Sequence, residues 1–593
     1  MSTARKKDVG AILRHRDVAS FRVWAPFAKA VAVIGSFNDW QPTPMVAEGD
    51  GYWFAEVKKA EAGQEYKFVI DTDSGQLVKN DPRSLQVTTS AGNSVLVDTA
   101  FDWGDDQFIA PPRNQQVVYE LHVGTFNRPD PSAAGTFQTA ADKLDHLADL
   151  GINMIELMPI NSMSMDRGWG YATEYIYAIE SLYGGRREFL EFVKAAHRRG
   201  IGVVLDVVYN HFGPDANMDL WCFDGWHEDG KGGIYFYNDW RSKTPWGDTR
   251  PDFGRPEVQQ YIADTIRMWM QDCRLDGLRV DSTIFIRNVV GRNNDPANDI
   301  ADGWRMMQQI TSVARKINPN AQLIAEDTSG NEFITKPKQD GGAGFATQWE
   351  VGFPSVLKRA LTAVHDADRN LTDVCRMLVG RYNDDAFQRV IYTDSHDSAA
   401  NGGARLSEEI SPGNTSTVFA RRRSLLASAF ILTAPGIPMI FQGQELMEDG
   451  SFNDWQALDW EKAEKFAGIV LAHRHLIALR KNNYGHTRGL TGHNVRVTHL
   501  NEESKLLAYH RWDTDSGAPG DAVVVVINFA NKAQRDYAIH FPRDGRWVVR
   551  FNSDWKGYSP DFKDIAVQDT HVQNGSGTIA LGPYAVLILS QDV

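Results

Sequence analysis

The chain has 593 residues, of which 42% are hydrophobic and 23% charged, a composition typical of globular proteins. Its net charge of −14 argues against nucleic acid and anionic membrane surfaces as main partners, because both attract basic proteins. The three cysteines form no CxxC pair, so we expect a reducing, cytoplasmic compartment rather than a disulfide framework or a zinc site. Residues 1–10 are polar, and no secretory signal is expected.

The first 108 residues predict a small β-sandwich. Residues 21–24, 30–34, 52–57 and 66–70 are apolar or alternating at strand length, and clusters of Gly, Pro and Asp separate them. A turn at residues 35–40 places two aromatic residues, Phe37 and Trp40, at a strand end. The pair Pro111-Pro112 lies at the boundary with the next region.

Alternating strands and helices follow over residues 109–488. Apolar runs predict eight strands, at residues 117–121, 152–158, 201–208, 278–281, 322–325, 345–349, 390–393 and 437–441. Helical periodicity is clear at residues 141–150, 186–199 and 258–269. The apolar stretch at 421–441 contains Ser, Thr, Pro and Gly, so it predicts a buried helix, a turn and a strand rather than a membrane span. Eight β/α units predict a closed parallel (β/α)8 barrel, a TIM barrel.

The alternation stops near residue 489. Strand patterns at 506–512, 522–527, 537–541, 547–551 and 584–589 have no helix between them, which predicts a C-terminal all-β domain. We therefore expect three domains, at residues 1–108, 109–488 and 489–593.

Several barrel strands end in charged side chains, which in this fold lie at the active-site face. The residues at these ends are Asp206, His211, Arg279, Asp281, Glu326, His396 and Asp397. A buried charge costs several kcal/mol unless it is paired, so one such ending can be a structural ion pair. A set of four charged strand ends predicts an active site instead.

Clustered carboxylates with histidines are typical of glycoside hydrolysis or transfer with retention. Arg279 and Asp281 are two residues apart and share a face, so the guanidinium can orient Asp281 as a nucleophile. Glu326 follows an apolar run that would raise its pKa, which suits a general acid. Asp397 would be the third carboxylate, bound to sugar hydroxyls, and His211 and His396 would donate hydrogen bonds to the same sugar. These residues lack the spacing of a metal-binding motif, so neither a catalytic metal nor a cofactor is expected.

The motifs DVVYNH at 206–211, GLRVD at 277–281, AED at 325–327 and SHD at 395–397 resemble the four short motifs of the α-amylase family, glycoside hydrolase family 13. The resemblance implies Asp281 as nucleophile, Glu326 as general acid/base and Asp397 as transition-state stabiliser. It implies further that Arg279, His211, His396 and Asp206 support the sugar site. Tyr171 resembles the family's stacking aromatic, and Trp169 is placed with it in the substrate site. The N-terminal region is similar to the carbohydrate-binding module of glycogen branching and debranching enzymes.

The motifs at 37–40, 325–327 and 395–397 resemble glycogen branching enzymes, whereas 119–126 and 206–211 are as similar to maltooligosyltrehalose trehalohydrolases. Ser398 departs from the Glu or Gln more often found in branching enzymes. We expect a branching enzyme acting on α-1,4-glucans such as amylose, glycogen and maltooligosaccharides. The alternatives are an α-1,4-glucan hydrolase of trehalohydrolase or amylase type and a non-catalytic glucan-binding protein. The oligomeric state is left open.

Nine aromatic residues fall within the long connection after the third barrel strand, from Trp221 to Phe253. Long loops over a barrel mouth are often functional, and flat aromatic faces suit pyranose rings. The same residues could instead form a small core of their own. Both interpretations stay open from the sequence.

Overall fold

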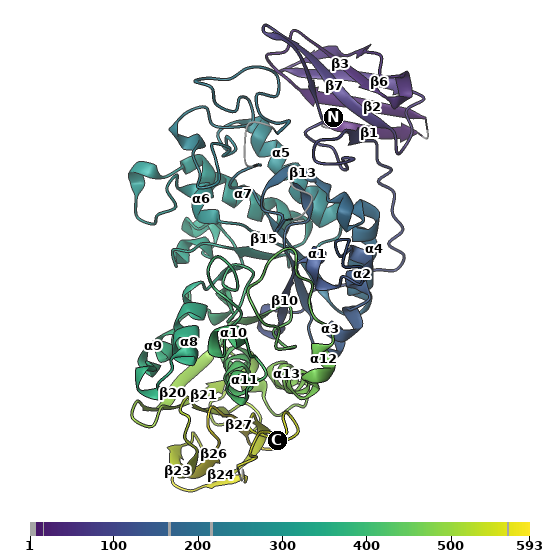
Figure 1. Ribbon diagram of the computed structural model, residues 1–593. Helices are drawn as coiled ribbons and strands as arrows, with labels where there is room; N and C mark the ends of the chain where they lie inside the picture. The colour runs from purple at the N-terminus through teal and green to yellow at the C-terminus, as the bar shows by residue number, and fades with distance from the viewer. Residues whose placement is uncertain (1–7, 16, 164–167, 214–217, 566–567) are drawn as a thin grey trace.

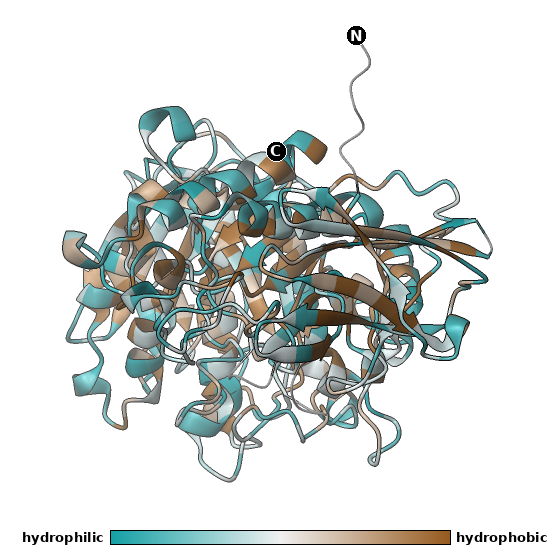
Figure 2. Cartoon of the chain, turned by 90° about the horizontal axis from the view of Figure 1, so that it is seen from above, coloured by the Kyte–Doolittle hydropathy of each residue, from teal (hydrophilic) through white to brown (hydrophobic). Residues whose placement is uncertain are grey.

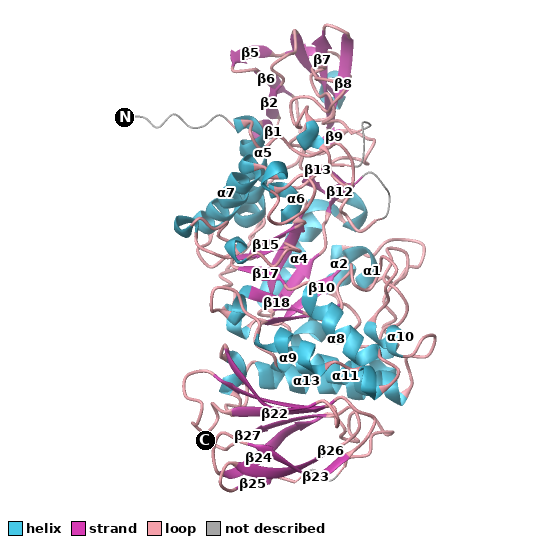
Figure 3. Ribbon diagram, turned by 90° about the vertical axis from the view of Figure 1, so that its left-hand side faces the viewer, coloured by secondary structure: helices cyan, strands magenta, loops and turns pink. Residues whose placement is uncertain are grey.

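The computed structural model describes residues 8–15, 17–163, 168–213, 218–565 and 568–593. The molecule is elongated, with the N-terminal strands at one end, the barrel in the middle and the C-terminal strands at the other end (Figures 1 and 3). The prediction that residues 1–10 contain no secretory signal falls mostly on residues 1–7, which lie outside the described residues. In the described parts of the chain, no helix has both the length and the apolar character needed to cross a bilayer.

Two antiparallel sheets form the N-terminal unit and confirm the predicted sandwich. One sheet has the order β1-β2-β6-β5, with bounds Gly10–His15, Val18–Trp24, Tyr52–Lys58 and Val46–Gly49. The other has the order β4-β3-β7-β8, with bounds Thr43–Pro44, Ala30–Gly35, Glu65–Thr72 and Gly75–Lys79, and β9 (Ser94–Val95) pairs with β7. Phe21, Val33 and Phe68 are fully buried between them. In Figure 2 hydrophobic residues gather on strands, and hydrophilic residues dominate many outer loops.

The eight predicted barrel strands all form and close in chain order, which confirms the TIM barrel. They are β10 (Val118–Leu121), β11 (Met154–Leu157), β14 (Gly202–Val207), β15 (Gly277–Val280), β16 (Gln322–Ala325), β17 (Thr347–Trp349), β18 (Arg389–Ile391) and β19 (Ile437–Phe441). Gly277 is required at the start of β15, because a Cβ there would lie 2.0 Å from the carbonyl oxygen of Gln322. The close contact of β15 with β16 brings the ends of these two strands together.

Helices cover the barrel (Figure 3). The predicted helices at 186–199 and 258–269 correspond to α4 (Gly185–Arg198) and α5 (Pro256–Arg267). The helix expected at 141–150 is instead α2 (Phe137–Ala141) and α3 (Leu144–Leu150), because Thr136 caps an earlier start and Lys143 leaves the helical conformation. The other α-helices of the described residues are α1 (Val123–Phe126), α6 (Thr283–Arg287), α7 (Ala301–Ile317), α8 (Gly352–Thr362), α9 (Leu371–Val379), α10 (Leu406–Ile410), α11 (Val418–Thr433), α12 (Lys462–Lys465) and α13 (Ala467–Arg480). Helix α11 and strand β19 confirm the interpretation of residues 421–441.

The C-terminal region is all-β, as predicted. One sheet has the order β20-β21-β22-β27-β24-β25, with bounds Asn494–Asn501, Leu506–Trp512, Val523–Asn528, Val586–Ser590, Gly545–Asn552 and Thr570–Val572. A second sheet pairs β23 (Gln534–His540) with β26 (Ser576–Leu581).

The connection between β14 and α5, here called the β14–α5 loop, packs against the N-terminal unit. Trp226 stacks on Phe27 with ring centroids 4.8 Å apart, and the Asp224 carboxylate accepts a hydrogen bond of 2.9 Å from the Phe27 backbone N–H. Most of the loop's aromatic residues are buried, namely Phe223, Tyr235, Phe236, Tyr237 and Phe253. Of its nine aromatic residues, all of which are described, only Trp240 and Trp246 are largely exposed to solvent. The loop is therefore mainly a small core, one of the two interpretations that the sequence left open, and Trp240 and Trp246 provide its exposed aromatic faces.

Candidate active site

One buried guanidinium gathers the carboxylates of three strand ends. Nη1 of Arg279 donates to Oδ2 of Asp206 at 2.6 Å and to Oδ1 of Asp281 at 2.9 Å. Nη2 lies 3.0 Å from Oε2 of Glu326. The guanidinium carbon lies 4.3 Å from the centre of the Trp349 ring, a cation–π contact. Arg279 is fully buried, so these carboxylates supply the compensation that a buried charge requires.

The register of the parallel strands explains this convergence. Asp206 on β14 is aligned with Arg279 on β15, and paired residues on neighbouring parallel strands share a face. Asp281 and Glu326 each come directly after the last residue of their strand. Ser282 then turns with a left-handed φ of 43°, and its N–H donates to Oε2 of Glu326 at 2.9 Å. The backbone turn after β15 thus holds the carboxylate that follows β16.

Both oxygens of Asp281 are fixed in direction. Arg279 contacts Oδ1, and Nδ2 of Asn210 donates to Oδ2 at 2.6 Å and to the backbone oxygen of Asp281 at 3.0 Å. The Asp281 side chain remains 10% exposed. A carboxylate that is oriented by two donors and still reaches the surface meets the geometric needs of a nucleophile.

Glu326 is poised to carry a proton near neutral pH. Burial raises its pKa to about 7, the charges of Asp281 and Asp397 act in the same direction, and Arg279 opposes them. Burial likewise raises the pKa of Asp206 to about 6 against the opposing charge of Arg279. A carboxyl with a pKa near the working pH can both give and take a proton, as a general acid/base must.

The two predicted histidines differ in charge near pH 7. Burial alone would lower the pKa of His396, but the charges of Glu120 and Asp397 outweigh it and raise this pKa to about 9. Nδ1 of His396 lies 2.5 Å from Oε1 of Glu120, and Nε2 lies 3.5 Å from Oδ1 of Asp397. Burial lowers the pKa of His211 to about 4, so this ring is neutral near pH 7. One histidine can therefore offer a cationic donor and the other a neutral one.

Aromatic rings and the third carboxylate border the same cluster. The Tyr171 hydroxyl donates to Oδ2 of Asp206 at 2.6 Å, and its ring stacks on His396 with centroids 5.1 Å apart. Trp169 meets His396 edge-on at 5.8 Å. The Asp397 side chain is 48% exposed, and Nδ2 of Asn401 donates to it at 3.2 Å. Among the predicted carboxylates of the cluster Asp397 is the most accessible, as a group that binds sugar hydroxyls must be.

His211 completes the predicted set. Its ring stacks on Trp246 at 4.6 Å, and Nδ1 contacts the side-chain oxygen of Asn210. Through Asn210 this histidine is linked to Asp281. The structure thus brings all nine predicted site residues into one contiguous cluster.

Four further residues belong to the cluster and were missed as site residues from the sequence. Glu120 on β10 pairs with His396, Asn210 holds Asp281, and Trp349 lies beneath Arg279. Glu156 on β11 is buried, and its pKa is raised well above the ordinary value by burial and then by the charge of Glu120. A carboxylate inside each of the apolar runs at 117–121 and 152–158 was the available signal for Glu120 and Glu156.

Comparison with known families accounts for most of the chain. The α-amylase catalytic domain matches residues 121–243 and 223–475, which together span more than half of the sequence. The carbohydrate-binding module 48, also described as the isoamylase N-terminal domain, matches residues 9–84. The C-terminal all-β domain of α-amylases matches residues 497–592.

Similar individual proteins cover nearly all of the chain. It is 29% identical to the 1,4-α-glucan branching enzyme GlgB of Bacillus caldolyticus over 90% of this chain and 80% of that protein. It is 28% identical to GlgB of Lactiplantibacillus plantarum over 98% and 94%, respectively. In structure it is similar to a pullulanase from Paenibacillus barengoltzii, with a TM-score of 0.76 and 21% identity over 100% of this chain and 96% of that one. The chain is an enzyme of the α-amylase family, glycoside hydrolase family 13.

Proposed function

We propose that the protein is a 1,4-α-glucan branching enzyme that acts through a covalent glycosyl-enzyme intermediate. The observation that carries the mechanism is that Arg279 contacts both Asp281, at 2.9 Å, and Glu326, at 3.0 Å, while the pKa of Glu326 is raised to about 7. A bridging guanidinium fits the carboxyl separation of about 5–5.5 Å in retaining enzymes.

In the first step an Asp281 oxygen attacks the anomeric carbon of an α-1,4-linked glucose. The bond from that carbon to the glycosidic oxygen breaks, and Glu326 gives its proton to the departing oxygen. In the second step the 6-hydroxyl of an acceptor glucan attacks the same carbon and displaces Asp281. Glu326 takes the hydroxyl proton, so the acid is regenerated and the configuration is retained.

The remaining residues of the cluster bind and orient the sugar. Tyr171 would stack on the glucose whose bond is cleaved, next to Trp169. Asp397 would accept hydrogen bonds from the hydroxyl groups of that glucose. The cationic His396 and the neutral His211 would donate hydrogen bonds to the same glucose. Asp206 and Arg279 keep the charges of the site balanced, since each contacts the other at 2.6 Å.

Two observations support transfer over hydrolysis. The branching enzymes from Bacillus caldolyticus and Lactiplantibacillus plantarum are similar over 90% and 98% of this chain. A transferase must also hold donor and acceptor together so that a bound hydroxyl outcompetes water through effective concentration. The N-terminal module and the exposed Trp246 beside His211 offer surface on which a second glucan chain could be held.

The proposed domains are residues 1–108, 109–488 and 489–593. The three free cysteines support a reducing, cytoplasmic compartment.

The test follows amylose by iodine absorbance and reducing ends together. Branching lowers the iodine colour with few new reducing ends, and a later isoamylase treatment releases short chains. Reducing ends that rise in step with the loss of colour, with nothing released by isoamylase, would refute branching in favour of hydrolysis. Free trehalose released from maltooligosyltrehalose would identify a trehalohydrolase. The Asp281→Ala variant serves as the inactive control.

A further inference from the structure

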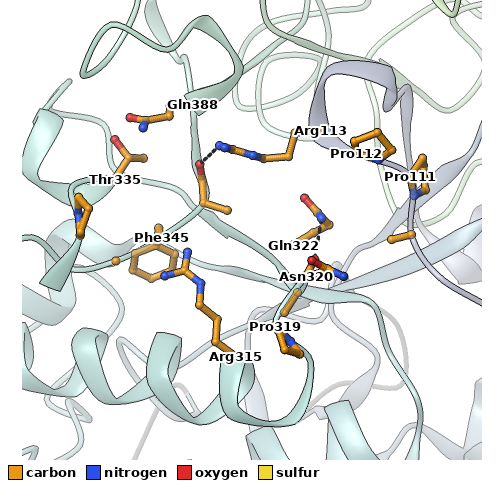
Figure 4. Close-up of a pocket in the computed structure, with 15 residues that line it drawn as sticks. Pro111, Pro112, Arg113, Arg315, Pro319, Asn320, Gln322, Thr335, Phe345 and Gln388 are labelled. Atoms are coloured by element: carbon orange, nitrogen blue, oxygen red, sulfur yellow. Dashed lines mark hydrogen bonds between the residues drawn. The ribbon is translucent and has the colours of Figure 1, made fainter.

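An open cleft of about 580 Å³ lies among the residues drawn in Figure 4. Its lining includes Gln322, the first residue of β16, together with Phe345 and Gln388, which precede β17 and β18. Glu326 follows the other end of β16, and His396 and Asp397 follow the other end of β18. The cleft therefore lies at the end of the barrel opposite to the candidate active site. The volume falls in the range of about 300–1,000 Å³ typical of small-molecule sites.

The charge of this cleft is opposite to that of the whole chain. Two arginines line it, Arg113 and Arg315, and no described lining residue is acidic, although the net charge of the protein is −14. Arg113 is held in place, since its Nη1 donates to the carbonyl oxygen of Ala346 at 2.8 Å and its Nη2 lies 3.4 Å from Asp385. Arg113 is therefore oriented by these two neighbours, and the Asp385 carboxylate pairs with its charge.

Arg315 comes from the last turn of α7 and lines the cleft together with Phe345 (Figure 4). Within the described ranges Arg315 forms no ion pair and no side-chain hydrogen bond. Burial, and then the positive charge of Arg113, lower its pKa from the ordinary value. A half-buried guanidinium that forms no ion pair and is repelled by a second cation has an uncompensated charge that a bound anion would neutralise.

The rest of the lining is suited to a polar molecule with a compact ring. Amide groups come from Asn320, Gln322 and Gln388, and flat apolar faces come from Phe345 and Pro319. Guanidinium groups bind phosphate through paired N–H donors, and amides bind hydroxyls. We propose that this cleft is a binding site for a sugar phosphate, separate from the glucan site.

Isothermal titration calorimetry on the full chain tests this site. Glucose 1-phosphate, inorganic phosphate and glucose are the probes, and the titrations are repeated on the inactive Asp281→Ala variant with saturating maltoheptaose in its active site. We expect wild-type protein to bind glucose 1-phosphate with a Kd below about 1 mM, and to bind inorganic phosphate and glucose at least tenfold more weakly. Arg315→Gln should weaken glucose 1-phosphate binding at least tenfold, because it removes the uncompensated cation.

The control is Lys316→Gln, which removes an exposed charge from the same turn of α7 outside the cleft lining. It should leave the Kd unchanged, and Arg315→Gln should retain wild-type turnover of amylose. The proposal is wrong if glucose 1-phosphate gives no binding, or if Arg315→Gln binds it as wild type does. Equal affinity for inorganic phosphate would overturn the assignment to a sugar phosphate. None of these outcomes depends on whether the enzyme branches or hydrolyses glucan.

Discussion

The barrel mouth and the β14–α5 loop stand out equally in the sequence, yet the structure uses them differently. The charged strand ends converge on Arg279, whereas most aromatic residues of the loop pack into a small core that holds the N-terminal unit. The difference follows from the cost of burial. A charge is buried only with partners, so clustered charges have few explanations, while aromatic rings gain from burial whether or not a sugar is bound.

Removal of either central carboxylate should have the largest effect. Asp281→Ala and Glu326→Ala should each lower turnover of amylose by about 10³-fold or more, because each removes a group that acts in bond cleavage. Only Glu326→Ala should regain fast first-step chemistry with α-maltosyl fluoride, whose leaving group needs no acid. Circular dichroism checks that both variants fold. Near-normal activity of either variant would refute its assigned role.

Glu120→Gln should lower kcat on amylose by roughly 10–100-fold with little change in KM, because it removes the carboxylate that keeps His396 charged. In the wild type the raised pKa of His396 contributes stability that is complete below pH 6.5 and is lost as the pH rises through about 9. Chemical denaturation across this range should show that loss in the wild type and a smaller one in Glu120→Gln. If both the kinetics and the pH dependence of stability match the wild type, Glu120 has no positioning role.

The wild-type pH profile should fall above neutrality. Glu326 must be protonated for bond cleavage, and its pKa is raised to about 7. The initial rate on amylose should therefore decrease about tenfold per pH unit above the midpoint of that titration. Glu326→Ala with α-maltosyl fluoride is the matched control and should lack this decrease. A wild-type rate that stays flat up to pH 9 would contradict the assignment of the acid.

Two tryptophans of the β14–α5 loop separate packing from sugar contact. Trp226→Ala removes the stack on Phe27 and should lower the free energy of unfolding by about 2–3 kcal/mol without changing kcat on short maltooligosaccharides. Trp246→Ala removes a ring that is 42% exposed beside His211 and should raise KM for amylose a few-fold with little loss of stability. Denaturant titration measures the free energy of unfolding of each variant, and steady-state kinetics measure its kcat and KM. Reversed results would show that the two roles are exchanged.

Sequence patterns were sufficient to predict the barrel and the convergence of its strand ends, because apolar runs and charge placement are local properties. The contacts that hold the site are not local. Glu120 and His396 are 276 residues apart, and Asn210 and Asp281 are 71 apart, so only the folded barrel shows that they meet. The burial of Tyr235 and Phe253 depends likewise on the packing of the β14–α5 loop, which no periodicity in the sequence reveals.

The central claim is that Asp281 forms a covalent bond to the sugar. A direct measurement is to treat Glu326→Gln with α-maltotriosyl fluoride, which glycosylates the nucleophile without an acid but leaves no base to release it. Intact-mass spectrometry should show one added maltotriosyl group, and peptide mapping should place it on Asp281. The double variant Asp281→Ala, Glu326→Gln should remain unlabelled. A label on another residue, or equal labelling of the double variant, would contradict the mechanism proposed here.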